Sequence, residues 1–124
     1  MSVEMIEMAC SPFINLSTLL HRSVIVGAST VRGAFTPAIL QHMASTHKRP
    51  VIFALSNPTS RAECTAAEAY ENTEGRCVFC SGSPFDPVEF EGKRFEPGQG
   101  NNAYIFPGVS LAAILGHFKH IPDK

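Results

Sequence analysis

The sequence predicts an α/β fold, a doubly wound parallel sheet with flanking helices, and three observations support this prediction. Short β-branched or apolar runs alternate with helical segments along the chain. The run Pro50–Leu55 is apolar without alternation, as in a strand covered on both faces. Each of the three apolar runs is followed by a loop of small and polar residues. Strands separated by helices in this order form parallel sheets with right-handed crossovers.

The first half of the chain is expected to contain a strand, a helix and a second strand. Ser23–Val26 is a β-branched run that stops at Gly27. The segment Thr36–His47 is expected to be helical, because its threonine can cap the first turn and the proline that follows is tolerated there. The run Pro50–Leu55 then forms the second strand, bounded by proline and by a Ser-Asn-Pro turn.

The second half is expected to add a helix, a strand, a hairpin and a last helix. Thr65 and Glu68 have the spacing of a capping box, so a short helix begins there. Cys77–Cys80 follows as the third strand. Glu89–Glu96 resembles a hairpin that turns at an internal Glu-Gly pair. The final helix starts at a Pro-Gly pair and covers Pro107–Phe118.

Composition restricts the class of protein. The chain has 124 residues, enough for one domain with one core, and 44% of them are hydrophobic while 17% are charged. Ten basic and eleven acidic residues give a formal charge of −1, and no basic cluster is present. Nucleic acid is therefore not an expected partner. The longest apolar stretches are far too short for a membrane span, so no membrane partner is expected.

The pattern Cys77-Val78-Phe79-Cys80 can be interpreted in two ways. A C-x-x-C pair can be a redox dithiol or half of a zinc site. It can also be a buried strand that happens to contain two thiols. Residues three apart in a strand point to opposite faces, which favours the second interpretation.

The three loops that follow the strands share a composition of small and polar residues. They are Gly27-Ala28-Ser29-Thr30, Ser56-Asn57-Pro58-Thr59-Ser60 and Ser81-Gly82-Ser83-Pro84-Phe85. Part of this composition is ordinary turn chemistry. In a parallel sheet, however, such loops emerge at one edge, where ligands bind. A cleft of hydroxyls, amides and backbone N–H groups suits a nucleotide or a small oxyacid.

Several blocks of the sequence resemble a known enzyme family, the malic enzymes. They are, in order, Arg49–Thr59, Ala62–Thr65, Glu74–Arg76, Ser81–Phe85, Pro97–Asn102 and Tyr104–Gly108. The resemblance is continuous from about Gly33 to His120. It implies a Rossmann-like sheet, with residues 23–124 as a partial NAD(P)-binding domain on its carboxyl side. Residues 1–22 resemble nothing assignable and are left as an amino-terminal segment.

The resemblance implies an activity and a set of binding residues. Malic enzymes oxidise L-malate with NAD or NADP and decarboxylate the product to pyruvate and CO2, using Mg²⁺ or Mn²⁺. The family's malate-holding asparagines match Asn57, Asn101 and Asn102. Nucleotide contacts are expected from Gly27, Ala28, Ser56 and Asn57. From the residues alone, Asn57 can also be a turn residue, and Asn101 and Asn102 can be caps on a loop.

The family's catalytic parts have no counterpart in this sequence. Its acid tyrosine, base lysine and metal carboxylates do not match any position here, and no G-x-G-x-x-G is present. We therefore assign no catalytic residue and no metal ligand. Tyr104 is expected to pack in the interior, and Glu63 and Asp86 are too isolated to bind a divalent metal. The chain is expected to orient substrate without catalysing the reaction alone.

Two alternative functions stay open. One is an inactive short isoform acting as a binding or subunit-interaction module. The other is a small thiol-redox protein built on the C-x-x-C pair.

Two further expectations concern association and location. A few parallel strands leave an unpaired edge, so we expect marginal stability, or association with itself or with a full-length homologue. The first 22 residues contain two glutamates and no lysine or arginine before Arg22, unlike a secretory or mitochondrial targeting segment. A cytoplasmic location is expected, and a mitochondrial one stays open for a parent enzyme.

Overall fold

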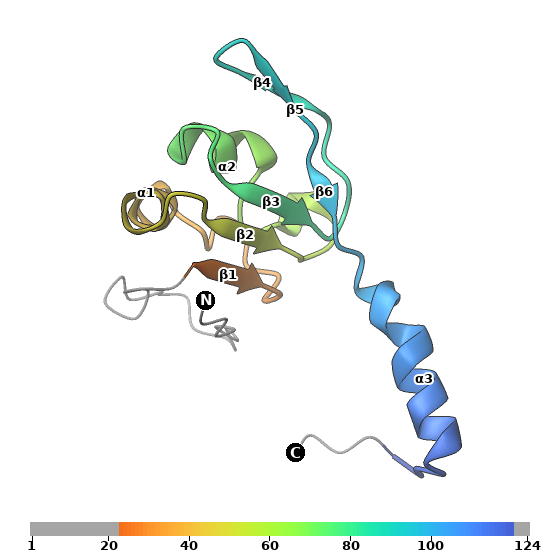
Figure 1. Ribbon diagram of the computed structural model, residues 1–124. Helices are drawn as coiled ribbons and strands as arrows, with labels where there is room; N and C mark the ends of the chain where they lie inside the picture. The colour runs from red at the N-terminus through yellow and green to blue at the C-terminus, as the bar shows by residue number, and fades with distance from the viewer. Residues whose placement is uncertain (1–22, 121–124) are drawn as a thin grey trace.

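The computed structural model describes residues 23–120, and its first elements alternate strand and helix as expected (Figure 1). The unassigned segment 1–22 and the end of the partial domain, 121–124, lie outside the described residues. In chain order the elements are β1 Val24–Gly27, α1 Pro37–Thr46, β2 Val51–Ala54, the 3₁₀ turn η2 Thr59–Arg61, α2 Ala66–Asn72, β3 Val78–Ser81, β4 Val88–Phe90, β5 Lys93–Phe95, β6 Gly98–Gln99, the 3₁₀ turn η3 Asn102–Ile105 and α3 Phe106–Leu115.

The main sheet has the strand order β1-β2-β3-β6, and every neighbouring pair is parallel. This confirms the predicted α/β class. The expected strand around residues 50–55 is central, with Ile52 in register between Ile25 and Phe79. The fourth strand, β6, was not predicted from the sequence. It has only two residues and pairs with β3 through Cys80↔Gly98, so the neighbouring strand imposes its conformation.

The core lies on one face of this sheet. Ile25, Ile52 and Phe79 pack there with Leu40 of α1 and Ala69 of α2. On the opposite face, the alternate side chains of β1, β2 and β3 are only half-buried: Val24, Val26, Val51, Phe53, Val78 and Cys80. The expectation that β2 is covered on both faces therefore holds for one face only, because within residues 23–120 both α1 and α2 pack on the same side.

Local capping signals place the two core helices as predicted. The Thr36 hydroxyl accepts from the Ile39 N–H at the start of α1. Thr65 and Glu68 form the complete capping box at the start of α2, where the Glu68 carboxylate accepts from the Thr65 N–H at 2.8 Å. The Arg76 guanidinium donates to carbonyls at the carboxyl end of α1, including that of Ala44 at 3.0 Å. These contacts fix both helices over the sheet.

The predicted hairpin is confirmed as β4 paired antiparallel with β5. It turns at Glu91 and Gly92, whose φ angles are 50° and 73°. Phe95 of β5 stacks on Tyr70 of α2 with ring centroids 4.5 Å apart. This aromatic pair attaches the hairpin to the core and brings the chain back to the sheet edge at β6.

The last helix, α3, extends away from the sheet (Figure 1). It starts at Phe106, one residue before the predicted Pro-Gly pair, and none of its residues is buried. Tyr104, just before it, was predicted to pack in the interior. That prediction is wrong: Tyr104 is 72% exposed, because η3 leads the chain off the sheet edge. None of the helices within residues 23–120 has the length and apolar character needed to cross a membrane.

Candidate functional site

The loops that follow β1, β2, β3 and β6 meet at the carboxyl edge of the sheet. Backbone bonds continue the ladder past the strand ends: the Leu55 N–H donates to the Gly27 carbonyl at 2.8 Å, and the Gly100 N–H to the Ser81 carbonyl at 2.8 Å. The three small-residue loops are therefore neighbours, as their order along the chain predicts. Their side chains determine what the edge can bind.

A buried carboxylate joins the first two loops. Glu63 is 0% exposed, and its Oε1 accepts from the Ser29 N–H at 3.1 Å and from the Ser56 hydroxyl at 2.5 Å. A Cβ on Gly27 would lie 2.5 Å from the Glu63 side chain, so only glycine leaves room for it. A buried carboxylate is stable when it accepts several hydrogen bonds, and this one also accepts from the Ser56 N–H at 3.4 Å. Glu63 thus fixes the loops that follow β1 and β2.

The Ser56 hydroxyl makes its hydrogen bonds inside the protein. It donates to Glu63 and accepts from the Thr30 N–H at 2.8 Å, and Ser56 itself is buried. Of the four residues assigned to nucleotide contact, Gly27 and Ser56 are therefore buried, while Ala28 and Asn57 are exposed.

Asn57 has a defined orientation at the edge. Its Oδ1 accepts from the Ser83 hydroxyl at 2.6 Å. The Ser83 loop is held in turn by Ser81, whose hydroxyl donates to the Ser83 carbonyl at 2.8 Å. A Cβ on Gly82 would lie 2.2 Å from the Leu55 carbonyl oxygen and 2.7 Å from Asn57 Oδ1, so the loops are in close contact. Among the side chains that the structure describes, none hydrogen-bonds to the Asn57 Nδ2 group, and Asn57 is an exposed residue.

Asn101 caps the turn that leads away from the sheet. Its Oδ1 accepts from the Ala103 N–H at 2.9 Å, which confirms the cap interpretation, and Asn102 begins η3. Asn101 lines a cleft of about 480 Å³. The other lining residues are Phe53, Leu55, Cys80, Gly100, Tyr104, Ile105 and Phe106. Asn57 is on a neighbouring loop and is not among them, so the structure brings Asn101 and Leu55 together in this cleft but does not place Asn57 in it.

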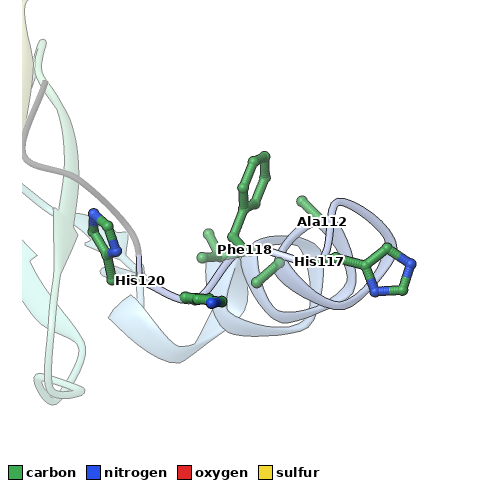
Figure 2. A pocket seen from close by; sticks show the side chains of 7 residues that line it. Ala112, His117, Phe118 and His120 are labelled. Carbon is green, nitrogen blue, oxygen red and sulfur yellow. The ribbon is translucent and has the colours of Figure 1, made fainter.

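A larger hollow of about 690 Å³ lies along α3 and residues 117–120, away from this edge (Figure 2). It is lined mainly by apolar side chains, with Phe118 standing over the helix. Figure 2 shows the His117 and His120 rings at opposite ends of the hollow, so they do not converge on a shared ligand. Among the described residues, no acidic side chain lines it.

The residues described by the structure do not fit a divalent metal. Within residues 23–120, no group of three or more histidine, cysteine, aspartate or glutamate side chains could hold one. Both oxygens of the buried Glu63 carboxylate already accept hydrogen bonds.

The thiols behave as apolar side chains. Cys77 packs in the core and Cys80 lines the cleft on the other side of the sheet, which confirms that the C-x-x-C pair points to opposite faces. Both are free, as is the buried Cys64. Burial raises the pKa of all three thiols above the ordinary value of 9.0. Thiols that stay protonated near neutral pH are poor nucleophiles and poor metal ligands, which disfavours the redox and zinc interpretations.

Comparison with known proteins identifies the family. The chain matches the malic enzyme NAD binding domain over residues 7–124. It belongs to the malic enzyme family. An NADP-dependent mitochondrial malic enzyme of Homo sapiens is 60% identical over 107 residues, covering 86% of this chain and 18% of the relative. An NAD-dependent mitochondrial malic enzyme of Ascaris suum is 58% identical over 99 residues, covering 80% and 15%. An NADP-dependent malic enzyme of Dictyostelium discoideum is 54% identical over 101 residues, covering 82% and 19%. The chain therefore spans about a fifth of the length of these curated relatives.

The match to the malic enzyme NAD binding domain indicates which class of ligand the carboxyl edge of the sheet is associated with. The parallel sheet is part of a domain that binds a nicotinamide nucleotide, and its relatives include both NAD- and NADP-dependent enzymes. The described loops fit such a ligand. A Cβ would meet the Leu55 carbonyl oxygen at Gly82 and the Cys80 sulfur at Gly100, so glycine is required at both positions. The sheet and its loops thus belong to the malic enzyme NAD binding domain.

Two residues that organise the edge were not assigned from the sequence. Glu63 was noted only as an acid near the loops, and Ser83 only as a loop residue. A signal existed for Glu63, since an acid between small apolar residues, in Ala62-Glu63-Cys64, must find donors if the segment is buried. No sequence signal distinguishes Ser83 from the other serines, because its partner lies 26 positions away.

Proposed function

We propose that this chain supplies part of the NAD(P)- and malate-binding site of a malic enzyme. The reaction served is the oxidative decarboxylation of L-malate to pyruvate and CO2. The observation that carries the proposal is the Asn57 amide at the carboxyl edge, an exposed residue whose oxygen accepts from Ser83, which leaves its Nδ2 group for a ligand. An amide held in this way presents two N–H donors to an acid without titrating.

Asn101 supports the same role. Its Oδ1 accepts from the Ala103 N–H, so its own N–H₂ group is available to a ligand in the cleft that it lines. We propose that Asn57, Asn101 and Asn102 donate to the malate carboxylate and keep it beside the nicotinamide. Holding the two reactants together is the largest contribution that such groups can make to hydride transfer.

The nucleotide-binding residues divide into two roles in this proposal. Ala28 and Asn57 are exposed and contact the nucleotide directly. Gly27 and Ser56 are buried against Glu63, so they act by holding the loop backbone in place. Loop rigidity matters because binding then costs less conformational entropy.

We propose that the chain does not catalyse the reaction alone. The acid, the base and the ligands for Mg²⁺ or Mn²⁺ belong to parts of the family's proteins that this sequence does not match. An alternative is a catalytically inactive binding or subunit-interaction module. The exposed apolar helix α3 favours the interaction part of this alternative and supports association with a second copy or with a full-length homologue.

A titration of the ¹⁵N-labelled chain, followed by amide NMR, tests the proposed binding site. Addition of NADP⁺ or NAD⁺, then of malate or pyruvate, is expected to shift the amides of the loops that follow β1, β2 and β3. Asn57→Ala should weaken the response to malate, whereas Asn72→Ala, on α2, should not. A titration that shifts no carboxyl-edge amide, or shifts only those of α3, would contradict the proposal.

A cytoplasmic location is also proposed. Some relatives are named mitochondrial, and the names of others give no compartment. Fluorescence imaging of the tagged chain, scored against a mitochondrial marker, tests it. Overlap with the marker would contradict the cytoplasmic location.

A further inference from the structure

Two exposed arginines lie in the loops at the carboxyl edge of the sheet. Arg32 is in the loop between β1 and α1, and Arg61 is in the loop between β2 and α2. The ion pairs recorded among residues 23–120 involve two other arginines, Arg76 and Arg94. Neither of the edge arginines is therefore paired with an acid in the described part of the chain.

The fold brings these two arginines together, although they are far apart in the sequence. The Gly33 N–H donates to the Ala62 carbonyl at 3.4 Å, and each arginine directly precedes one residue of this bonded pair. A second backbone bond, from the Phe35 N–H to the Glu63 carbonyl at 3.0 Å, holds the same two loops side by side. Arginine side chains are long, so both guanidinium groups can reach one ligand.

Each arginine is attached to a well-defined backbone. Arg32 lies in a turn closed by a 3.3 Å backbone bond from the Ala34 N–H, and Gly33 supplies the positive φ of 71° at the third position. Arg61 ends the 3₁₀ turn η2, where its N–H donates to the Pro58 carbonyl at 2.8 Å. Because these turns are already formed, binding a ligand orders mainly the two side chains.

The surface formed by these two loops is positively charged. Within residues 28–36 and 55–65 the one acid is Glu63, which is 0% exposed and bonded to the neighbouring serines. The next acid, Glu68, accepts from the Thr65 N–H as the cap of α2. No exposed acid lies in either loop, and two guanidinium groups in such a setting attract an anion.

An anion at this surface has to be bound by side chains. The Ser29 N–H donates to the Glu63 carboxylate. The Thr30 N–H donates to the Ser56 hydroxyl, and the next N–H, of Val31, donates to a serine hydroxyl of its own loop at 3.4 Å. Successive backbone N–H groups are what commonly holds the pyrophosphate of a dinucleotide. In the loop after β1 these groups are already used inside the protein.

We propose that Arg32 and Arg61 together bind the 2′-phosphate of NADP⁺, so that this chain favours NADP⁺ over NAD⁺. The inference rests on the proposed nucleotide binding and specifies which nucleotide the site takes. A guanidinium presents a planar fork of N–H donors that pairs with two phosphate oxygens. A phosphate monoester such as the 2′-phosphate carries a charge of about −1.5 to −2 and three acceptor oxygens. Two arginines therefore match it in charge and in hydrogen-bond donors.

Amide NMR titrations of the ¹⁵N-labelled chain with NADP⁺ and with NAD⁺ test this assignment. NADP⁺ should bind about 10-fold or more tightly than NAD⁺ and should shift the amides around both arginines. Arg32→Ala and Arg61→Ala should each weaken NADP⁺ binding about 10-fold, as expected for losing a hydrogen bond to a charged group, and change NAD⁺ binding less than about 2-fold. Arg32→Lys keeps the charge but loses the planar fork, so its affinity for NADP⁺ should be intermediate.

Arg49→Ala is the matched control. Arg49 is exposed and lies just before β2, at the opposite edge of the sheet, so this variant removes the same charge away from the proposed site. It should bind both nucleotides as the wild type does. Adenosine 2′,5′-bisphosphate and AMP serve as shorter probes, and they should show the same preference because they differ only in the 2′-phosphate. Added salt should weaken the binding of NADP⁺ more than that of NAD⁺.

Three results would overturn the inference. They are equal wild-type affinities for NADP⁺ and NAD⁺, a preference for NADP⁺ that survives both arginine-to-alanine substitutions, and arginine variants that lose NAD⁺ binding as much as NADP⁺ binding. In each of these cases the chain still binds a nucleotide, so the proposed function stands. A chain that binds neither nucleotide would contradict the proposed function and the inference with it.

Discussion

The Ser83 hydroxyl donates a hydrogen bond to the Asn57 amide oxygen, with 2.6 Å between the two oxygens, and so joins the loops that follow β3 and β2. Because the oxygen is occupied, the Nδ2 group is the part of the amide left for a ligand. The Ser81 hydroxyl holds the Ser83 backbone at 2.8 Å, so the orientation extends back to the sheet. The carboxyl edge thus presents an oriented amide N–H₂ group, the donor that we propose for malate.

Ser83→Ala should weaken malate binding. The substitution removes the hydrogen bond that orients Asn57, so the amide samples other rotamers before it binds. A net hydrogen bond contributes about 0.5–1.5 kcal/mol, and we expect the dissociation constant from the amide titration to rise about 3–10-fold. Ser45→Ala, an exposed serine on α1, is the matched control. Equal affinities for the two variants would show that Ser83 does not position Asn57.

Glu63→Gln should destabilise the chain. Both carboxylate oxygens accept hydrogen bonds, from the Ser29 N–H and from the Ser56 N–H and hydroxyl. The glutamine amide would replace one of these acceptor oxygens with an N–H₂ donor. A buried donor without an acceptor costs about 1–3 kcal/mol in the free energy of unfolding, measured by urea denaturation. Glu71→Gln, exposed on α2, should change it by less than about 0.5 kcal/mol. A Glu63 variant as stable as the control would contradict the account of the two loops.

Gly82→Ala should disturb the loop that follows β3. Its Cβ would meet the Leu55 carbonyl oxygen at 2.2 Å, and backbone atoms cannot move aside as a flexible side chain can. We expect a loss of about 1–3 kcal/mol in the free energy of unfolding. Gly108→Ala is the control, because nothing outside its own stretch of helix lies within 4 Å of its Cβ position, and it should leave the free energy of unfolding unchanged or raise it by about 0.5–1 kcal/mol. If both variants melt at the wild-type temperature, the close packing of these loops is not as described.

Alkaline pH should destabilise the chain through its buried thiols. Burial raises the pKa of Cys64 above its ordinary value of 9.0, with smaller contributions from Glu68, Cys77 and Glu63. A raised pKa in the folded state means that the protonated thiol favours folding, fully so below the unfolded value. This contribution is lost as the pH rises beyond 9.0. Urea midpoints measured from neutral to alkaline pH should fall less steeply in Cys64→Ala than in the wild type, and equal slopes would contradict the assignment.

Much of the fold could be predicted because its signals are local. The caps at Thr36 and Thr65 and the apolar run of β2 each specify an element from a few adjacent residues. The strand β6 could not be predicted in the same way. Gly98 and Gln99 have no preference for a strand, and they form one only because β3 lies beside them.

The candidate site was predictable at the level of its loops but not of its contacts. The asparagine positions followed from blocks that resemble malic enzymes. The roles of Glu63 and Ser83 depend on partners that are 7 to 34 positions away in the chain, which no local pattern encodes. The error at Tyr104 has a related cause, since an apolar stretch predicts burial without specifying what will cover it.

A chimera tests most directly the claim that this chain supplies the malate-binding part of a malic enzyme site. Its residues would replace the matching segment of the 60% identical human relative, and malate-dependent reduction of NADP⁺ would be measured. We expect activity, and Asn57→Ala within the chimera should lower kcat/KM for malate about 10–100-fold, as expected for losing a hydrogen bond to a charged group. The matched Asn72→Ala chimera should keep its kcat/KM. A folded, active chimera in which Asn57→Ala leaves kcat/KM unchanged would contradict the account.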